Sequence, residues 1–549
     1  MRQEKKQFNY YWQEVIFMKG KIDKMLESYP AAVFKNRKEH VLVKQEEPDQ
    51  QKAITANSRT IPGIITNRGC CYAGCKGVVL GPLRDAVVLT HGPIGCGYYT
   101  WGTRRNKGRT RGDELNLLNY CFSTDLQEGD IVFGGEKKLR QAVKEAVEIF
   151  NPKTVFICST CPVGLIGDDI HAVATWAQKE FGIKVVAFSC EGYKGVSQSG
   201  GHHIANNGLI KTIIGTGDKA VGKYSINVLG EYNIGGDGWE VERILRNIGY
   251  DIVSVMTGDG TVEDLKSAHK AALNVVQCHR SINYIGEMMK TKYGHDWIKV
   301  NFIGVESTIK SLRDIAQYFG DKALIDRTEE VIAEELADIQ PAMEEYRNIC
   351  KGKTAALFVG GSRAHHYQKL LKDLGIETVL AGYEFAHRDD YEGREVIPSI
   401  KEDGDSKNIP SIEIEPDELN YRVYLSKERQ EELKDKISLN YYAGMIKEME
   451  DGSIVVDDLN HYETEEFLKV LKPDIFCSGI KDKYIAHKAG IFSKQLHSYD
   501  YSGPYASFRG AVNFARDISM GLTTPAWNLT VPPWKTQPML EGSFGVTQK

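Results

Sequence analysis

Residues 154–188, TVFICSTCPVGLIGDDIHAVATWAQKEFGIKVVAF, contain a complete strand–helix–strand unit. The apolar runs at 154–158 and 184–188 are typical of short buried strands. Between them, a glycine at position 182 ends a stretch with the apolar spacing of a helix, carried by Ile170, Val173, Ala174, Ala177 and Phe181. Strands that alternate with single helices predict parallel pairing.

The same pattern returns twice along the chain. A strand at 225–230 is followed by a helical stretch that ends at Gly249, and a strand at 354–359 by one that ends at Gly375. Each is followed by another apolar run. We therefore predict an α/β fold with three doubly wound, Rossmann-like domains built on mainly parallel sheets.

This pattern also predicts the domain boundaries. We expect an N-terminal extension (1–58), three α/β domains (59–222, 223–350 and 351–510) and a C-terminal helical segment and tail (511–549). Charged residues break the pattern at about 391–452. Because long inserted segments belong on surfaces, we expect an insertion on the surface of the third domain.

Composition excludes several classes of protein. The chain has 549 residues, of which 42% are hydrophobic and 26% charged, the balance of a globular protein rather than a disordered one. A net charge of -5 argues against electrostatic binding of nucleic acid. We see no secretory signal and no apolar run long enough for a membrane span, so we expect a cytoplasmic protein.

Eleven cysteines, an odd number in a large chain, argue against a disulfide framework. Three of them have glycine or proline neighbours, in RGCCYAGCKG (68–77), THGPIGCG (90–97) and STCPVGLIGDD (159–169). Thiolates with backbone amides around them hold iron–sulfur clusters. The spacings match neither a C-x-x-C zinc site nor a ferredoxin, so buried thiols in tight turns remain an alternative.

Other candidates are weaker when taken alone. Adjacent His202 and His203 would point about 100° apart on a helix, so only one could face a pocket, and a structural role for both is an alternative. Neither Cys278 nor His497 proves metal binding. The glycine pairs at 134–138 and 360–363 lack both common phosphate-loop patterns, so we expect no nucleotide site in this chain.

Over about residues 60–534, the chain resembles the alpha subunits of nitrogenase component 1, the molybdenum–iron proteins. The motifs that carry the resemblance are RGCCYAGCKGVVLGP, HGPIGCGYYTWGTRR, STDLQEGDIVFGGEKKL, CPVGLIGDDI, CEGYKGVSQSGGHHIAN, GEYNIGGD, QCHRSINYI, GYEFAHRDDY, SGIKDKY and HSYDYSGPY. The insertion resembles the clostridial-type branch. The resemblance implies a catalytic subunit that reduces dinitrogen to ammonia, with concomitant hydrogen evolution.

The resemblance also implies partners and a first metal site. Cys70, Cys96 and Cys161 match ligands of the P-cluster (8Fe–7S), which is shared with a beta subunit in an α2β2 heterotetramer. Electrons would come from a transiently docked, homodimeric, ATP-hydrolysing iron protein. The neighbouring Cys71, Cys75 and Cys158 are expected to be buried thiols rather than ligands.

A second site is implied for the iron–molybdenum cofactor (7Fe–Mo–9S–C) with homocitrate, buried between the domains. Cys278 matches its iron ligand and His497 its molybdenum ligand. Residues that match its lining are Val78, Arg104, Gln198, His202 and Arg363, and those near homocitrate are Gln198 and Lys481. Gln495 and Tyr499 stand where some relatives carry Glu and Trp, which leaves the homocitrate contacts open.

Three alternatives remain from the sequence. A cofactor-assembly scaffold would resemble this family without catalysing the reaction. A vanadium or iron-only homologue would share the fold but not the metal. A non-catalytic α/β binding protein with buried thiols belongs to a different class, and bound iron would exclude it.

Overall fold

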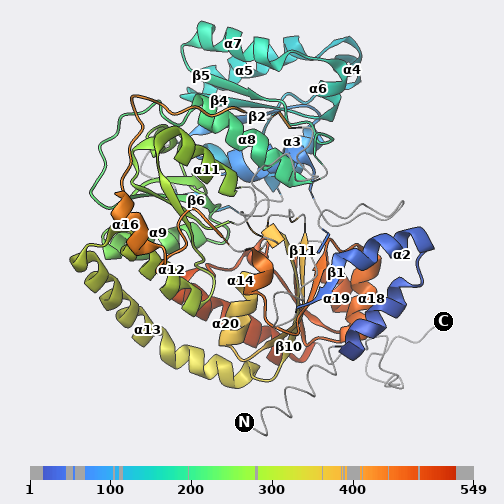
Figure 1. Cartoon of the computed structure of the whole chain (residues 1–549). Helices are drawn as coiled ribbons and strands as arrows, with labels where there is room; N and C mark the ends of the chain where they lie inside the picture. Colours follow the sequence, from blue (N-terminus) through green and yellow to red (C-terminus); the bar gives the residue numbers. More distant parts are fainter. Residues whose placement is uncertain are drawn as a thin grey trace, which may run out of the picture.

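Three sheets with helices packed against them form the molecule (Figure 1). The computed structural model describes residues 16–44, 54–55, 69–102, 106–109, 115–195, 197–278, 282–360, 363–384, 386, 390–391, 393, 409–410, 412–442, 444–479 and 482–526. Ten of the eleven strand pairings among the described residues are parallel, and the antiparallel exception is described below. The predicted fold class is therefore confirmed.

The first sheet has the strand order β3-β2-β4-β5. Its strands are β2 (Ala86–His91), β3 (Phe122–Ser123), β4 (Thr154–Ser159) and β5 (Lys184–Phe188). Helices α5 (Glu136–Phe150) and α7 (Ile170–Phe181) share a core with Val155 and Ile157, while Phe156 and Cys158 belong to a second core beyond the sheet. This division follows from the alternation of side chains along a strand.

The second core, which contains Phe156 and Cys158, also includes the π-helical segment η3 (Ala73–Leu80) and helix α8 (Gln198–Thr212). The two backbones approach closely. A Cβ atom added at Gly74 would lie 1.7 Å from the carbonyl oxygen of Gln198, and one added at Gly201 would lie 1.9 Å from that of Cys71. Glycine at both positions therefore permits this contact.

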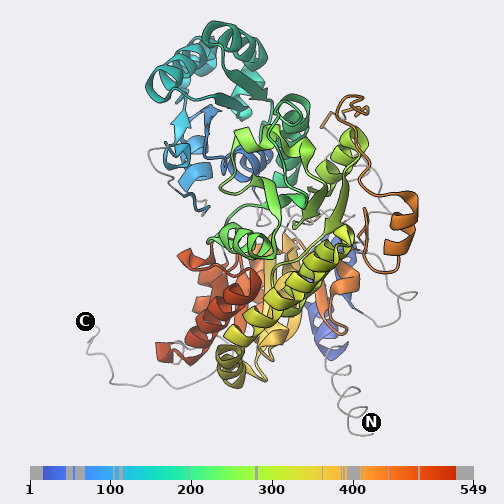
Figure 2. The same cartoon turned by 90° about the vertical axis from the view of Figure 1, so that its left-hand side faces the viewer.

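The second sheet has the order β7-β6-β8-β9. Its strands are β6 (Ser225–Glu231), β7 (Asp251–Thr257), β8 (Leu273–Val276) and β9 (Asp296–Lys299). Its helices are α9 (Asp237–Ile248), α10 (Val262–Lys266), α11 (Ile282–Tyr293) and α12 (Val305–Phe319). The long helix α13 (Lys322–Cys350) then leads toward the third sheet and packs against α20 (Ser507–Thr523), the last described helix (Figure 2).

The third sheet has the order β1-β12-β11-β10-β13-β14. Its parallel strands are β10 (Thr354–Gly360), β11 (Glu377–Glu384), β12 (Ile454–Asp457), β13 (Ile475–Ser478) and β14 (Phe492–Gln495). Its helices are α14 (Ala364–Asp373), α17 (Met445–Glu448), α18 (His461–Leu471) and α19 (Lys483–Lys488). Among the described helices, none is both long and apolar enough to cross a membrane.

Part of the expected N-terminal extension belongs to this third sheet. Strand β1 (Val41–Val43) pairs antiparallel with β12 at the sheet edge. Before it, helix α2 (Ala31–Arg37) ends on a buried ion pair between Arg37 and Glu463, whose Nε and Oε1 atoms are 2.7 Å apart. The polar composition of this region did not indicate a strand. The domain boundaries themselves stay a prediction.

Part of the insertion lies elsewhere than expected, whereas its end packs on the third sheet, where Glu448 pairs with Lys369 of α14. Its described segment 412–442, which includes α16 (Lys427–Leu433), packs beside the second sheet and not on the third domain (Figure 1). The Asp417 amide donates to the Lys292 carbonyl at 2.8 Å, and the Asn440 amide donates to that of Trp297 at 2.8 Å. Apolar side chains explain the difference, because burial of Leu425, Leu433 and Ile437 outweighs proximity along the chain.

Candidate functional site

Three predicted cluster ligands lie at one edge of the first sheet. Cys96 lies in α3 (Ile94–Gly102), after β2, and Cys161 begins α6 (Cys161–Ile166), after β4. Because β2 and β4 are parallel neighbours, the helices that follow them begin at the same edge. Cys70 lies just before η3.

Side chains from two of these segments meet at Gly192. A Cβ atom added at Gly192 would lie 3.0 Å from Sγ of Cys161 and 3.4 Å from Sγ of Cys70. Burial, together with the nearby Cys70 and Cys161 thiols, raises the pKa of Cys96. Cys70 is exposed and the other two are half-buried. The structure thus brings Cys70, Cys96 and Cys161 together near the surface, and we refer to them as the open thiol group.

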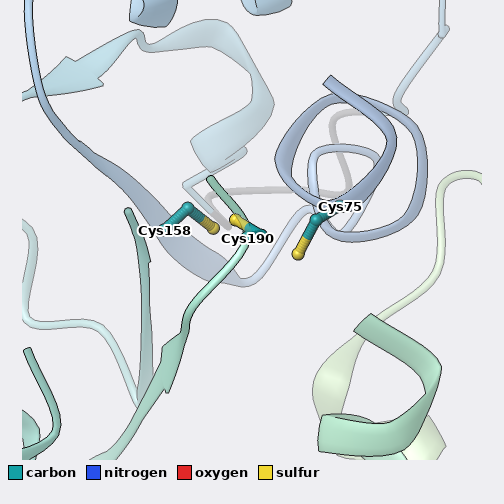
Figure 3. Close-up of side chains that lie close together, drawn as sticks. All are labelled: Cys75, Cys158 and Cys190. Atoms are coloured by element: carbon teal, nitrogen blue, oxygen red, sulfur yellow. The ribbon is translucent and has the colours of Figure 1, made fainter. Parts of the chain in front are cut away.

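A second set of thiols lies in the core. The Sγ atoms of Cys75, Cys158 and Cys190 are all within 4.8 Å of one another, and the three residues are fully buried (Figure 3). We refer to them as the buried thiol group. Cys75 and Cys158 are buried, as expected. Cys190 was not singled out, because a lone cysteine after a strand carries no signal of its own.

The predicted cofactor thiol, Cys278, follows strand β8 and is 3% exposed. Strand β6 approaches it closely at Gly230, where an added Cβ atom would lie 2.6 Å from that of Cys278. Gly230 has a φ of +81°, a backbone conformation that favours glycine. The β6 end therefore holds Cys278 in place through backbone contact.

The predicted cofactor imidazole, His497, follows strand β14 of the third sheet. Its Nε2 atom accepts a hydrogen bond from the Gly360 amide at 3.1 Å and lies 3.6 Å from Oε2 of Glu384. Burial and the nearby Arg363 cation lower the pKa of His497 to about 4. The ring is therefore neutral at physiological pH, which is the form that binds a metal.

Arg363 connects these two predicted ligands. It is buried, and although burial lowers the pKa of its guanidinium, Tyr499, Tyr367, Cys278 and Glu231 raise it overall. The same guanidinium acts on His497. Cys278 and His497, more than two hundred residues apart in sequence, thus share one buried cation as a neighbour.

A buried acidic pair beside Arg363 is a further part of the site. Burial, with the nearby Asp237 carboxylate, raises the pKa of Glu231 to about 7. Asp237 accepts a hydrogen bond from the Tyr499 hydroxyl at 2.5 Å. Oε2 of Glu231 has no hydrogen-bond partner in the described part of the chain. The sequence signal for Glu231 is its position at the carboxyl end of a predicted strand.

The two adjacent histidines of α8 have different neighbours. The His202 ring lies 6.5 Å from that of Tyr232, which directly follows β6, whereas the His203 ring lies 4.9 Å from that of Tyr284 on α11. Both are buried. As expected, the rotation of about 100° between consecutive helical residues directs them to different surroundings. His202 faces Tyr232, at the carboxyl end of β6.

The remaining predicted lining residues are less completely placed. Gln198 begins α8 and Val78 lies in η3, both half-buried. A π-helical segment such as η3 is rare and often marks a functional site. The contacts of Gln198 and Val78 with a cofactor stay a prediction. Arg104 and Lys481 lie outside the described residues.

Comparison with known proteins agrees with this geometry. A family model described as nitrogenase component 1 type oxidoreductase matches residues 70–523. The nitrogenase molybdenum-iron protein alpha chain of Clostridium pasteurianum is 58% identical over 515 residues, which cover 93% of this chain and 96% of that one. The alpha chain of the same name from Methanosarcina barkeri is 54% identical over 517 residues, which cover 94% and 97%.

A solved structure leads to the same family. The structure described as nitrogenase Cp1 at pH 6.5 is 58% identical, with a TM-score of 0.91, and the match covers 94% of this chain and 100% of that chain. The expected resemblance, enzyme class and catalytic role are confirmed. The chain therefore belongs to the nitrogenase component 1 type oxidoreductases, as an alpha subunit.

Proposed function

We propose that this subunit reduces dinitrogen with two metal clusters, a P-cluster shared with a beta subunit and an iron–molybdenum cofactor with homocitrate. The observation that carries the proposal is that Cys278 and His497 both lie within electrostatic range of the buried Arg363. The names of the relatives support the molybdenum type over the vanadium and iron-only alternatives.

The open thiol group suits a shared cluster. Its three cysteines offer soft sulfur ligands for iron, and their exposure leaves one side of the group accessible from outside the chain. Three thiolates cannot complete a cluster of eight irons, so further thiolates have to come from a partner. The group therefore supports a beta-subunit interface here and an α2β2 assembly.

The second site suits an anionic cofactor with two protein ligands. A thiol matches iron and a neutral imidazole matches molybdenum. Arg363 supplies a fixed positive charge, and Oε2 of Glu231, which has no hydrogen-bond partner among the described residues, is a buried polar atom available to a bound group. When bound, the cofactor supplies the metal centre at which dinitrogen is reduced.

His202 is the residue of this chain that we assign to proton delivery. Its ring is buried on the side of the β6 end, close to the Tyr232 ring. An imidazole can donate a hydrogen bond and relay a proton near neutral pH. His203, which packs on Tyr284, has no such role in this proposal.

Electrons would enter beside the open thiol group. Large apolar side chains are exposed on α4 (Glu128–Phe133) and on the adjacent α6, with Phe133 90% and Leu165 78% exposed. Exposed apolar patches mark interaction surfaces. Because α6 also carries Cys161, this patch is our proposed docking site for the iron protein. The free cysteines suit a reducing compartment, the cytoplasm.

Ligand substitutions test the assignment of the cofactor site. We expect Cys278→Ala or His497→Ala to remove molybdenum from the purified complex and to leave the P-cluster spectroscopic signal, because the two sites use separate ligands. Cys477→Ala, in the buried strand β13, is the matched control and should retain both. Normal molybdenum content in either ligand variant would contradict the assignment. Molybdenum bound with homocitrate would also exclude an assembly scaffold.

Substitution of the adjacent histidines tests proton delivery. His202→Gln should retain molybdenum and still evolve hydrogen, while ammonia formation falls by about a hundredfold, the typical cost of losing a positioned proton donor. His203→Gln should have a milder effect. The measurement is the yield of ammonia and hydrogen per electron delivered by the iron protein. Ammonia formation at the wild-type rate in His202→Gln would show that the residue is structural.

A further inference from the structure

The buried thiol group shares two chain segments with the open one, and Cys190, which follows β5, supplies its third thiol. Cys75 lies five residues after Cys70, and Cys158 lies three residues before Cys161. Cys190 lies two residues before Gly192, the glycine beside Cys70 and Cys161. A second set of sulfur atoms therefore lies in the core next to the segments that carry Cys70 and Cys161, and Figure 3 shows its three side chains side by side.

Backbone contacts hold the three thiols in this arrangement. Cys158 is on strand β4, whose alternation directs it to the core that also contains Cys75 and Cys190. The Cys190 thiol lies 3.6 Å from the carbonyl oxygen of Ser159, and its amide donates to the Ser159 hydroxyl at 3.1 Å. Cys75 projects from the π-helical segment η3. All three come from regular elements or their immediate ends, which makes the group rigid.

The charge around the group differs from that of an apolar core. Lys76, directly after Cys75, is only 4% exposed. Although burial raises the pKa of Cys158, hydrogen bonds from Cys190 and Cys75 and the Lys76 cation lower it overall to about 5. A thiolate at Cys158 therefore has two sulfhydryl donors and a buried positive charge nearby. Cysteines that serve only as small apolar residues need none of these partners.

We propose that Cys75, Cys158 and Cys190 form a binding site for a monovalent thiophilic cation, Cu(I), held by three sulfur atoms. Soft sulfur ligands select Cu(I). Zinc requires a fourth ligand, and within the described residues no histidine, aspartate, glutamate or further cysteine joins this group. Binding displaces thiol protons, and Lys76 offsets part of the remaining negative charge. The inference does not depend on which clusters occupy the sites described above.

The test uses the intact complex with its beta subunit, purified without oxygen. Cu(I) is supplied from a competing chelator, which controls the free copper concentration. Loading lasts several hours because a buried site exchanges slowly. Unbound copper is then removed. We expect about one copper per alpha chain that is absent from Cys190→Ser and from Cys75→Ser. X-ray absorption at the copper edge should show sulfur ligands only. Cys477→Ser, another fully buried cysteine far from the group, should bind copper like the wild type.

Two controls keep the result interpretable. Iron and molybdenum contents must remain unchanged in each variant and after copper loading, since loss of either would indicate damage to the cluster sites. Cells grown with added copper provide a second route of loading during folding. If neither route gives the wild type more copper than Cys190→Ser, the proposal is wrong. A disulfide within the group, found by mass spectrometry of the oxygen-free protein, would also overturn it.

Discussion

The open and buried thiol groups share two stretches of chain, around 70–75 and 158–161, but have opposite environments. Cys161 begins a helix at the sheet edge and is half-buried, whereas Cys158, three residues earlier, lies inside a strand and is fully buried. The open group can be completed by a partner chain, while the buried group is enclosed by its own core. Proximity in sequence therefore does not distinguish a cluster ligand from a core thiol; the position relative to the strand end does.

The largest expected effect comes from removing a thiol of the open group. The Cys161→Ala variant should lose most of its P-cluster iron. Its rate of ammonia formation from dinitrogen should fall by at least about a hundredfold, because electron transfer through the shared cluster fails. Cys158→Ala is the matched comparison and should keep its iron. Iron analysis of the purified complex measures both. Equal iron loss in the two variants would abolish the distinction between the groups.

An intermediate effect is expected at the glycine between the two groups. In Gly192→Ala the new methyl group would lie 3.0 Å from Sγ of Cys161 and 3.3 Å from Cβ of Cys70, so the open group has to shift. We expect partial iron occupancy and an activity several-fold below the wild type. Gly20→Ala adds a methyl group with nothing within 4 Å and should change neither quantity. Full iron occupancy in Gly192→Ala would mean that the open group tolerates displacement.

The smallest effect concerns stability rather than iron. Cys158→Ala removes a fully buried sulfur atom, which should lower the free energy of unfolding by about 1 kcal/mol through lost packing. Cys121→Ala, at an exposed position, should leave it unchanged. The urea midpoint of the complex provides the measurement. A stability loss of similar size in both variants would argue that burial does not separate the two positions.

Much of the fold follows from local patterns in the sequence. The strand–helix–strand unit at 154–188 forms β4, α7 and β5 close to the expected bounds, because apolar spacing and glycine stops act within a few turns of chain. The short helix α6 between β4 and α7 was not predicted. The three repeats of this pattern predict three parallel sheets. The resemblance adds the ligand positions Cys70, Cys96 and Cys161, and the structure brings these together.

Only the tertiary structure decided how distant segments meet. Strand β1 joins the third sheet from a polar region, the segment 412–442 covers the second, and Cys190 completes the buried thiol group. Arg363 lies within electrostatic range of both Cys278 and His497, which follow strands of two different sheets. Each of these contacts depends on apolar burial and charge pairing between residues far apart in sequence, and no local periodicity encodes such pairings. The sequence by itself therefore determined the repeating elements, and packing determined the sites between them.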